Sequence, residues 1–229
     1  MPHMELFKIV KLHDELKSWS PFLKTWHDLT ERCVQHTDGD YSPFCYRERT
    51  NTGLLAAAAI KNDWVALEEY KAQKKDIDTR QKYDGRADLV LIHKIKLKKT
   101  LYEIEAKLVR KPISTNPDKR SLGFLEKAFN SARKNRENED NDYTEHKVAL
   151  TFIVPFIDPL KYPNDKPELF EIQNKLITTI DDISDRYEPD LLVYSFIKKG
   201  CELLVSKQQK RKYGYGTIIV GEIVNTFTR

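Results

Sequence analysis

The segment YDGRADLVLIHKIKLKKTLYEIEAKLVRK, residues 83–111, decides how this sequence folds. Two strand-like runs, RADLVLI (86–92) and TLYEIEAKLV (100–109), flank a lysine-rich turn, which is the pattern of a β-hairpin. Three charged residues lie inside or beside these runs: Asp88, Glu105 and Lys107. Burying a charge costs several kcal/mol unless it is paired or binds a metal. The hairpin is therefore either an exposed edge with a cross-strand ion pair or a functional site.

Strand alternation separates the second run into two faces. Glu103, Glu105 and Lys107 project to one side, whereas Tyr102, Ile104 and Ala106 project to the other. The apolar side is expected to face the core. If the two strands pair, Asp88 comes beside Glu105, and two carboxylates converge on one point. Such a pair repels unless a cation binds between them, and oxygen ligands suit Mg²⁺ or Mn²⁺.

The composition predicts a folded α/β protein. The chain has 229 residues, of which 40% are hydrophobic, enough for one sizeable domain with an added subdomain. The net charge is only +4, but lysines and arginines gather in three segments, 94–99, 107–111 and 207–216. Local basic patches of this kind are expected where a protein meets a polyanion.

Several function classes find no support in the sequence. Three cysteines, an odd number, and the lack of a signal-like apolar segment predict reduced thiols and a cytoplasmic location. No run of 18 apolar residues predicts a membrane span. The phosphate loop G-x-x-x-x-G-K-[ST] and the hydrolase motif G-x-S-x-G are both absent.

Hydrophobic spacing predicts the remaining elements. We expect an N-terminal helical extension over residues 1–40, with two helices divided at Ser20-Pro21, followed by a main domain over 41–229. Ser42-Pro43 predicts the start of another helix, which continues to about residue 62. The other predicted elements are a strand at 64–75, a helix at about 120–137, a central strand at 146–157, a helix at 167–186, and strands at 190–197, 201–207 and 216–224. This order predicts a mixed central sheet flanked by helices.

The charged residues of the hairpin also carry a family resemblance. Asp88, sixteen further residues, and then Glu105-Ala106-Lys107 resemble the D-x(n)-(D/E)-x-K signature of the PD-(D/E)XK nuclease superfamily. The resemblance covers roughly residues 43–157, including the order helix, three strands, helix, strand. It implies a restriction-endonuclease-like fold, with a core like that of Holliday-junction resolvases. The proline that often precedes the aspartate is Ala87 here.

The resemblance implies a metal-dependent nuclease. Asp88 and Glu105 would hold one or two Mg²⁺ or Mn²⁺ ions, with the backbone carbonyl of Ala106, and Lys107 would orient or activate the attacking water. Many members add a glutamate on the helix before the first strand. YRERTNTGLLAAAAI (46–60) is similar to that helix and nominates Glu48. Glu68 and Glu69 are alternatives, but they fall where the first strand is expected.

The expected substrate is DNA. Four basic residues just past the catalytic strand are placed to contact backbone phosphates: Arg110, Lys111, Lys119 and Arg120. Cutting both strands with one site per chain favours a homodimer. We expect an endonuclease acting in restriction, phage defence, transposition or recombination. Two alternatives remain: a catalytically silent binding or assembly subunit of a larger defence or nucleoprotein complex, and a nuclease that acts on RNA.

Two further features concern aromatic residues. Trp19, Trp26 and Trp64 are expected to anchor the core. The segment KQQKRKYGYG (207–216) interleaves basic and aromatic residues, which suits phosphate contact or base stacking, but a surface hairpin loop has the same composition.

Overall fold

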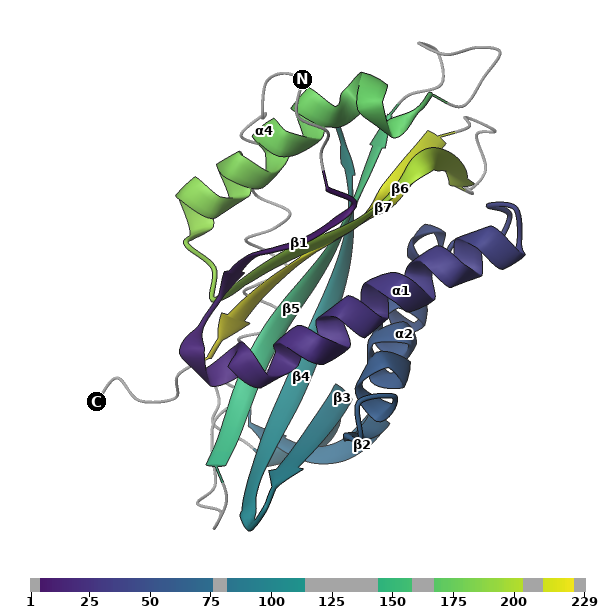
Figure 1. The fold of residues 1–229 in the computed structure, drawn as a ribbon. Coiled ribbons are helices and arrows are strands. Elements are labelled where there is room, and N and C mark those ends of the chain that lie inside the picture. The colour runs from purple at the N-terminus through teal and green to yellow at the C-terminus, as the bar shows by residue number, and fades with distance from the viewer. Residues whose placement is uncertain (1–4, 76–81, 114–143, 158–166, 204–211, 225–229) are drawn as a thin grey trace.

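The fold is an α/β arrangement built on one mixed sheet (Figure 1). The computed structural model describes residues 5–75, 82–113, 144–157, 167–203 and 212–224. The strands are β1 (Phe7–Leu12), β2 (Val65–Lys75), β3 (Lys82–Ile95), β4 (Lys98–Pro112), β5 (Thr144–Ile157), β6 (Leu191–Leu203) and β7 (Lys212–Ile223). They form a seven-stranded sheet in the order β1-β6-β7-β5-β4-β3-β2. The helices are η1 (Asp14–Trp19), α1 (Ser20–His36), η2 (Pro43–Cys45), α2 (Glu48–Ile60) and α4 (Leu169–Tyr187), where η marks a 3₁₀ helix.

Strand β5 lies at the centre of the sheet, as its hydrophobic sequence predicts. It pairs antiparallel with β7 and parallel with β4, in a register that runs from Thr100↔Thr144 to Pro112↔Phe156. A parallel pair requires a crossover connection between its strands. The helix predicted at about 120–137 belongs to this connection and lies outside the described residues.

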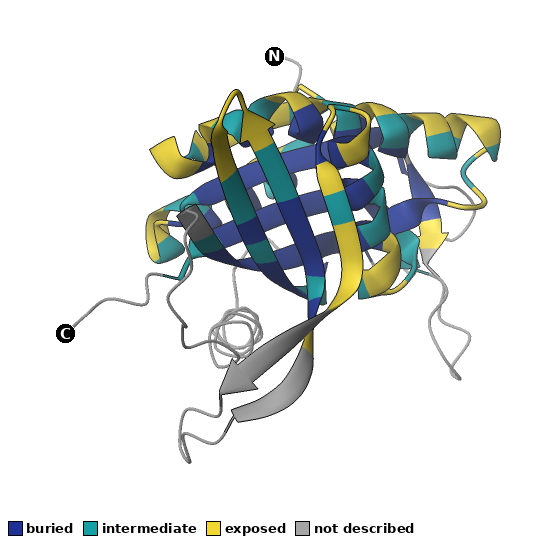
Figure 2. Ribbon diagram, turned by 90° about the horizontal axis from the view of Figure 1, so that it is seen from below, coloured by how far each residue is buried: buried dark blue, intermediate teal, exposed yellow. Residues whose placement is uncertain are grey.

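Helices cover both faces of the sheet (Figure 1). On one face, α1 and α2 pack against a core that includes Tyr102, Ile104 and Ala106, so the predicted apolar side of β4 is confirmed. Trp19, Trp26 and Trp64 are buried in the same core, as expected. On the other face, α4 packs on residues of β5, β6 and β7. Figure 2 shows the sheet largely buried between helices whose outer sides are exposed.

The N-terminal prediction of two helices is correct only for the second. Helix α1 begins at Ser20 with Pro21 in its first turn, as predicted. The segment Phe7–Leu12 is instead strand β1, which pairs antiparallel with β6 at the edge of the sheet, and Asp14–Trp19 forms a short 3₁₀ helix. The apolar residues of Phe7–Leu12 fit the spacing of a helix or of a strand, and pairing with β6 makes the segment a strand. The sheet therefore includes residues from both sides of the expected division at residue 40.

The C-terminal strands are longer than predicted. The expected strands at 190–197 and 201–207 are joined in β6, with a register shift between Phe196 and Cys201. Strand β7 already begins at Lys212, so Tyr213 and Tyr215 are core residues, and the Tyr215 hydroxyl donates a hydrogen bond to the Pro167 carbonyl at 3.1 Å. The base-stacking interpretation is therefore wrong for these two tyrosines. Residues 207–211 lie outside the described part of the chain.

Candidate active site

Strands β3 and β4 separate near the motif residues. Their pairing runs from Ile95↔Lys98 to Leu89↔Ile104, and beyond that point β4 continues beside β5. Beyond Ile104, the N–H groups of β4 that point toward β3 no longer pair with that strand and need other partners. Side-chain carboxylates provide them: Asp88 accepts a hydrogen bond from the Ala106 N–H at 2.7 Å, and Glu48 accepts one from the Leu108 N–H.

The ammonium group of Lys107 lies among three oxygen groups at this edge. Its Nζ atom is 3.6 Å from Glu48 Oε1 and 3.8 Å from Asp88 Oδ2, and it donates a hydrogen bond to the Ala106 carbonyl at 2.5 Å. The three groups come from α2, β3 and β4. The side chains of Lys107, Glu48 and Asp88 are 29%, 32% and 28% exposed, so the site is open to solutes. Glu48, Asp88, Lys107 and the Ala106 carbonyl are thus brought together.

The N-terminus of α2 determines where Glu48 lies. The sequence predicts one helix from residue 43, but η2 ends at Cys45 and α2 starts only at Glu48, after Arg47 in an extended conformation. Arg110 fixes this junction, because its Nη2 atom donates to the carbonyls of Cys45 at 3.0 Å and Tyr46 at 2.9 Å. The exposed Arg110, predicted to contact phosphate, therefore also holds the chain that positions Glu48.

The electrostatics at Glu48 reflect its partial burial. Burial raises the pKa of the Glu48 carboxyl, and the charge of Asp88 raises it further. The ammonium of Lys107 and the Leu108 N–H oppose this change because they stabilise the charged form. The partners at the edge of β4 therefore favour the charged form of Glu48.

Glu105 differs from the other motif residues in its surroundings. The register places it opposite Asp88, one position beyond the last pair of β3 and β4, as the hairpin prediction requires. It is only 5% exposed, so the charged face of β4 is not open along its whole length. Among the described residues, no three His, Cys, Asp or Glu side chains are arranged to hold a metal ion together.

The carboxylates still suit a hard divalent cation that takes only a few of its ligands from the protein. Mg²⁺ commonly keeps several waters and binds through one or two carboxylates plus substrate phosphates. Glu48, Asp88 and the Ala106 carbonyl supply oxygen ligands of that kind around one point, which Lys107 Nζ occupies. The residues present therefore fit Mg²⁺ or Mn²⁺ as a partial ligand set.

The two alternative upstream acids lie elsewhere. Glu69 pairs with Arg86, at 3.5 Å between Oε2 and Nη1. The carboxylate of Glu68 lies against Gly53 of α2, where an added Cβ would be 3.2 Å from Oε1. Glu48 is the acid of the three that the structure places beside Lys107.

Strand β2 has an unusual backbone conformation opposite Asp88. The register of β2 and β3 is the same on both sides of this point, at Glu68↔Leu89 and Tyr70↔Ala87, so Glu69 lies opposite Asp88. Glu69 has a φ of 53°, in the left-handed region that non-glycine residues adopt rarely. Sequence reasoning missed this feature, since no glycine or asparagine marks the position.

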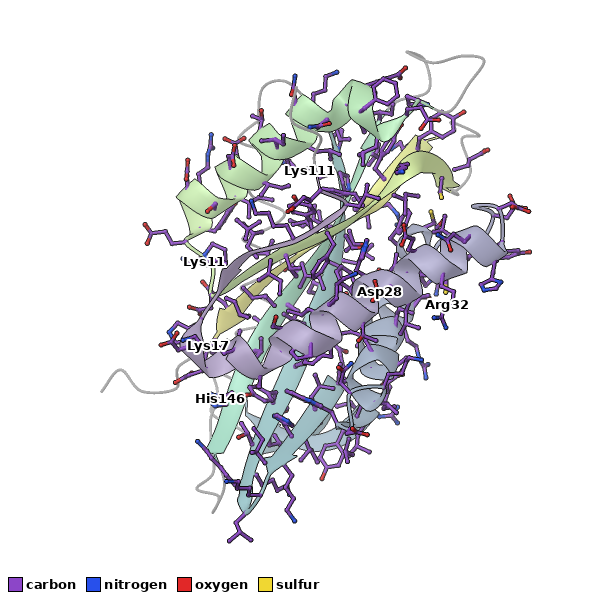
Figure 3. The ribbon with its side chains drawn as sticks, viewed as in Figure 1. Lys11, Lys17, Asp28, Arg32, Lys111 and His146 are labelled. Carbon is purple, nitrogen blue, oxygen red and sulfur yellow. The ribbon has the colours of Figure 1, made fainter. Side chains whose placement is uncertain are left out.

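The structure buries Lys111, one of the residues predicted to contact phosphate. Lys111 is 6% exposed and lies beneath α4 (Figure 3). Burial lowers the pKa of its amine, with Arg186 adding to the effect and Asp182 opposing it. Strand alternation puts Lys111 on the same face as Lys107, and α4 covers that face further along the strand. Lys119 and Arg120 lie outside the described residues.

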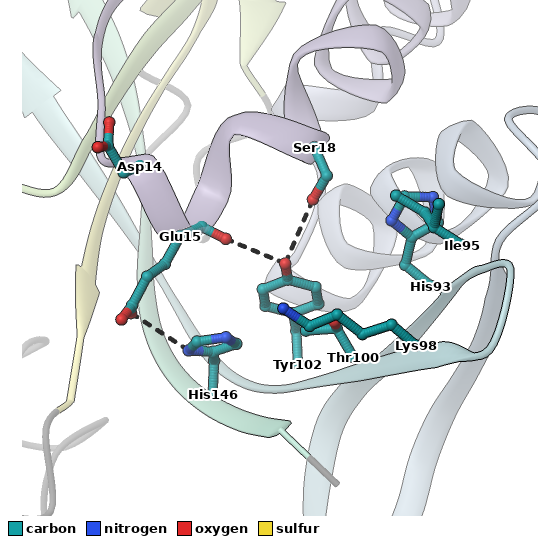
Figure 4. Close-up of a pocket in the computed structure, with 9 residues that line it drawn as sticks. All are labelled: Asp14, Glu15, Ser18, His93, Ile95, Lys98, Thr100, Tyr102 and His146. Carbon is teal, nitrogen blue, oxygen red and sulfur yellow. Dashed lines mark hydrogen bonds and ion pairs between the residues drawn. The ribbon is translucent and has the colours of Figure 1, made fainter.

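A second concavity lies near the start of β4 (Figure 4). Its volume is about 340 Å³, and its lining includes Tyr102, His93 and His146. The Tyr102 hydroxyl donates to the Glu15 carbonyl at 3.0 Å, and His146 Nδ1 is 3.2 Å from the Glu15 carboxylate. These contacts attach η1 to the sheet. No sequence motif marks this group, because its members come from four separate elements.

Comparisons of the chain with protein-family models, with curated proteins and with solved structures each gave no match. The class that can be stated from the fold is an α/β protein with a mixed seven-stranded sheet. No helix in the described ranges has the length and apolar character to cross a membrane.

Proposed function

We propose that this protein is a metal-dependent nuclease of the PD-(D/E)XK type that hydrolyses phosphodiester bonds in DNA. The observation that carries the proposal is the meeting of Glu48, Asp88 and the Ala106 carbonyl around Lys107. These groups are far apart in the sequence, and the motif and its upstream helix nominate each of them. A hairpin edge that merely faced water would not require a glutamate from α2 to join it.

The order of the elements supports the same proposal. Helix α2 is followed by the antiparallel strands β2, β3 and β4, and then by β5, which is parallel to β4. This agrees with the expected order of helix, three strands, helix and strand. The second helix of that order falls in the connection between β4 and β5, which is long enough to contain one.

The chain's own groups have distinct tasks in this proposal. The cation would be held by Asp88, Glu48 and the Ala106 carbonyl. Glu105, which lies next to Ala106 on β4, is the further carboxylate that the motif nominates. A bound Mg²⁺ or Mn²⁺ supplies charge that polarises the scissile phosphate and lowers the pKa of a bound water. Lys107 presents a positive charge to the phosphate and helps to orient the attacking water.

We further propose that the substrate is DNA and that the protein acts as a homodimer. It would work in the cytoplasm, in restriction, phage defence, transposition or recombination. Contacts with phosphate would come from the exposed Arg110 and from Lys119 and Arg120. One observation favours the silent binding or assembly subunit as a second candidate: within the described residues, three acidic groups do not gather at one point. The two candidates differ in whether the protein cuts what it binds.

A cleavage assay on purified protein tests the proposal. Supercoiled, linear, branched and single-stranded DNA, and a single-stranded RNA, are incubated with Mg²⁺ or Mn²⁺ and separately with a chelator. The variants are Asp88→Asn and Lys107→Met, with Lys17→Met as the control because Lys17 is an exposed lysine on η1.

We expect cleavage that requires metal and is lost in both site variants but kept in the control. Cleavage that persists in Asp88→Asn and Lys107→Met would contradict the site. Binding of DNA without cleavage by the unsubstituted protein would favour the assembly subunit, and cleavage of RNA alone would change the substrate.

A further inference from the structure

We infer that Lys107 is a built-in competitor of the metal: its ammonium group occupies the cation position of the metal-free protein and must leave before a divalent ion binds. This inference rests on the proposed function and deepens it, because it concerns how the same site is loaded. It follows from the contacts of Lys107 Nζ, which meets Glu48 Oε1, Asp88 Oδ2 and the Ala106 carbonyl at 3.6, 3.8 and 2.5 Å.

The three oxygen groups around Lys107 are those nominated as metal ligands. An ammonium group and a divalent metal ion both require anionic or carbonyl oxygens, and each neutralises the repulsion between Glu48 and Asp88. The two cations repel each other and cannot share one position. The hydrogen bond to the Ala106 carbonyl is decisive, because it uses the backbone oxygen that would otherwise face the metal.

Lys107 has the freedom to leave this position. Its side chain is 29% exposed, and an ammonium group on a flexible four-carbon stem can rotate into water while it remains charged. Asp88 stays in place without Lys107, since the Ala106 N–H holds its carboxylate at 2.7 Å. Glu48 is likewise held by the Leu108 N–H. The carboxylates thus form a fixed receptor, and the lysine is the movable part.

The movement would couple metal binding to the task of Lys107. While Lys107 pairs with Glu48 and Asp88, the two carboxylates neutralise its charge. Once a metal ion replaces it, the ammonium group becomes available to a substrate phosphate at the mouth of the site. The lysine therefore raises the metal concentration at which the site fills.

Titration with Mn²⁺ alone, followed by electron paramagnetic resonance in the absence of DNA, tests the inference. The proteins compared are the unsubstituted chain, Lys107→Met, which keeps the stem and removes the charge, and Lys17→Met, which removes an exposed lysine paired with Asp14. We expect the Kd for Mn²⁺ to fall about tenfold or more in Lys107→Met, because metal binding no longer has to break the ion pairs of Lys107 with Glu48 and Asp88, and two attractions at about 4 Å are of that size even at the dielectric constant of water. Lys17→Met should bind as the unsubstituted chain does.

A second measurement separates displacement from simple repulsion. In protein with ¹³C-labelled lysine, the Cε signal that disappears in Lys107→Met is followed during addition of Mg²⁺. We expect it to move toward the position of exposed lysines, while the Lys17 signal stays unchanged.

Equal Mn²⁺ affinities in the unsubstituted protein and Lys107→Met would overturn the inference, as would a Lys107 signal that does not respond while Mg²⁺ binds. Failure of both proteins to bind Mn²⁺ at millimolar concentration would instead contradict the proposed function itself.

Discussion

The substitution Gly216→Ala should destabilise the fold severely, because the backbone of β6 leaves no room for a side chain at Gly216 of β7. Its φ is 131°, and an added Cβ would be 2.0 Å from the Ser195 carbonyl oxygen and 2.8 Å from Phe196 Cα. Both contacts are with backbone, which cannot move aside as a side-chain tip can. The unfavourable φ costs about 1–2 kcal/mol. Overpacking adds about 1–3 kcal/mol, so the free energy of unfolding should fall by about 2–5 kcal/mol.

Chemical and thermal unfolding measure this loss. In a domain of this size, each kcal/mol lowers Tm by about 2–4 °C, so a decrease of about 10 °C is expected. Gly53→Ala is the matched control, since its Cβ meets only the flexible tip of Glu68 at 3.2 Å. Helix propensity favours alanine there by up to about 1 kcal/mol. A Gly216→Ala protein as stable as Gly53→Ala would refute the close approach of β6 and β7.

Two further predictions concern a buried histidine and the junction before α2. His27 is buried and its Nδ1 lies 2.8 Å from the Ser195 hydroxyl; burial lowers its pKa, with Lys24 adding to the effect and Glu31 and Asp28 opposing it. The unfolded chain then binds a proton that the folded chain does not, so the free energy of unfolding should fall as pH drops below about 6.5, by at most about 1.4 kcal/mol per unit. Urea unfolding of His27→Gln between pH 5 and 8 should lack this part of the pH dependence, and an identical dependence would contradict it. Arg110→Gln should lower the unfolding free energy by about 1 kcal/mol through loss of its contacts with two carbonyls. It should also slow cleavage by displacing Glu48, and an unchanged cleavage rate would show that Glu48 does not depend on this contact.

The sequence could predict those parts of the fold that depend on local periodicity. Alternation along β4 places Tyr102, Ile104 and Ala106 in the core, and this is confirmed. The hairpin between 86–92 and 100–109 also fixes the register that sets Asp88 opposite Glu105. The most hydrophobic run is the central strand, because β5 contributes residues to the cores on both faces of the sheet.

The remaining features depend on contacts between distant segments. Phe7–Leu12 is a strand because β6 offers it an edge, and Lys111 is buried because α4 crosses its face of the sheet. The left-handed conformation of Glu69 and the separation of β3 from β4 follow from the whole sheet. The proximity of Glu48 to Lys107 was expected through the family resemblance, whereas the contact of Arg110 with the chain before α2 was not.

The assignment of the catalytic site is tested by the rate of DNA cleavage by Asp88→Asn under single-turnover conditions. Asparagine keeps an oxygen that can accept the hydrogen bond from the Ala106 N–H but removes the negative charge, so the fold should be retained. We expect a rate about 100- to 1,000-fold below that of the unsubstituted protein at the same Mg²⁺ concentration, with unfolding curves that nearly coincide. Cleavage by Asp88→Asn at the unsubstituted rate would contradict the assignment of this site.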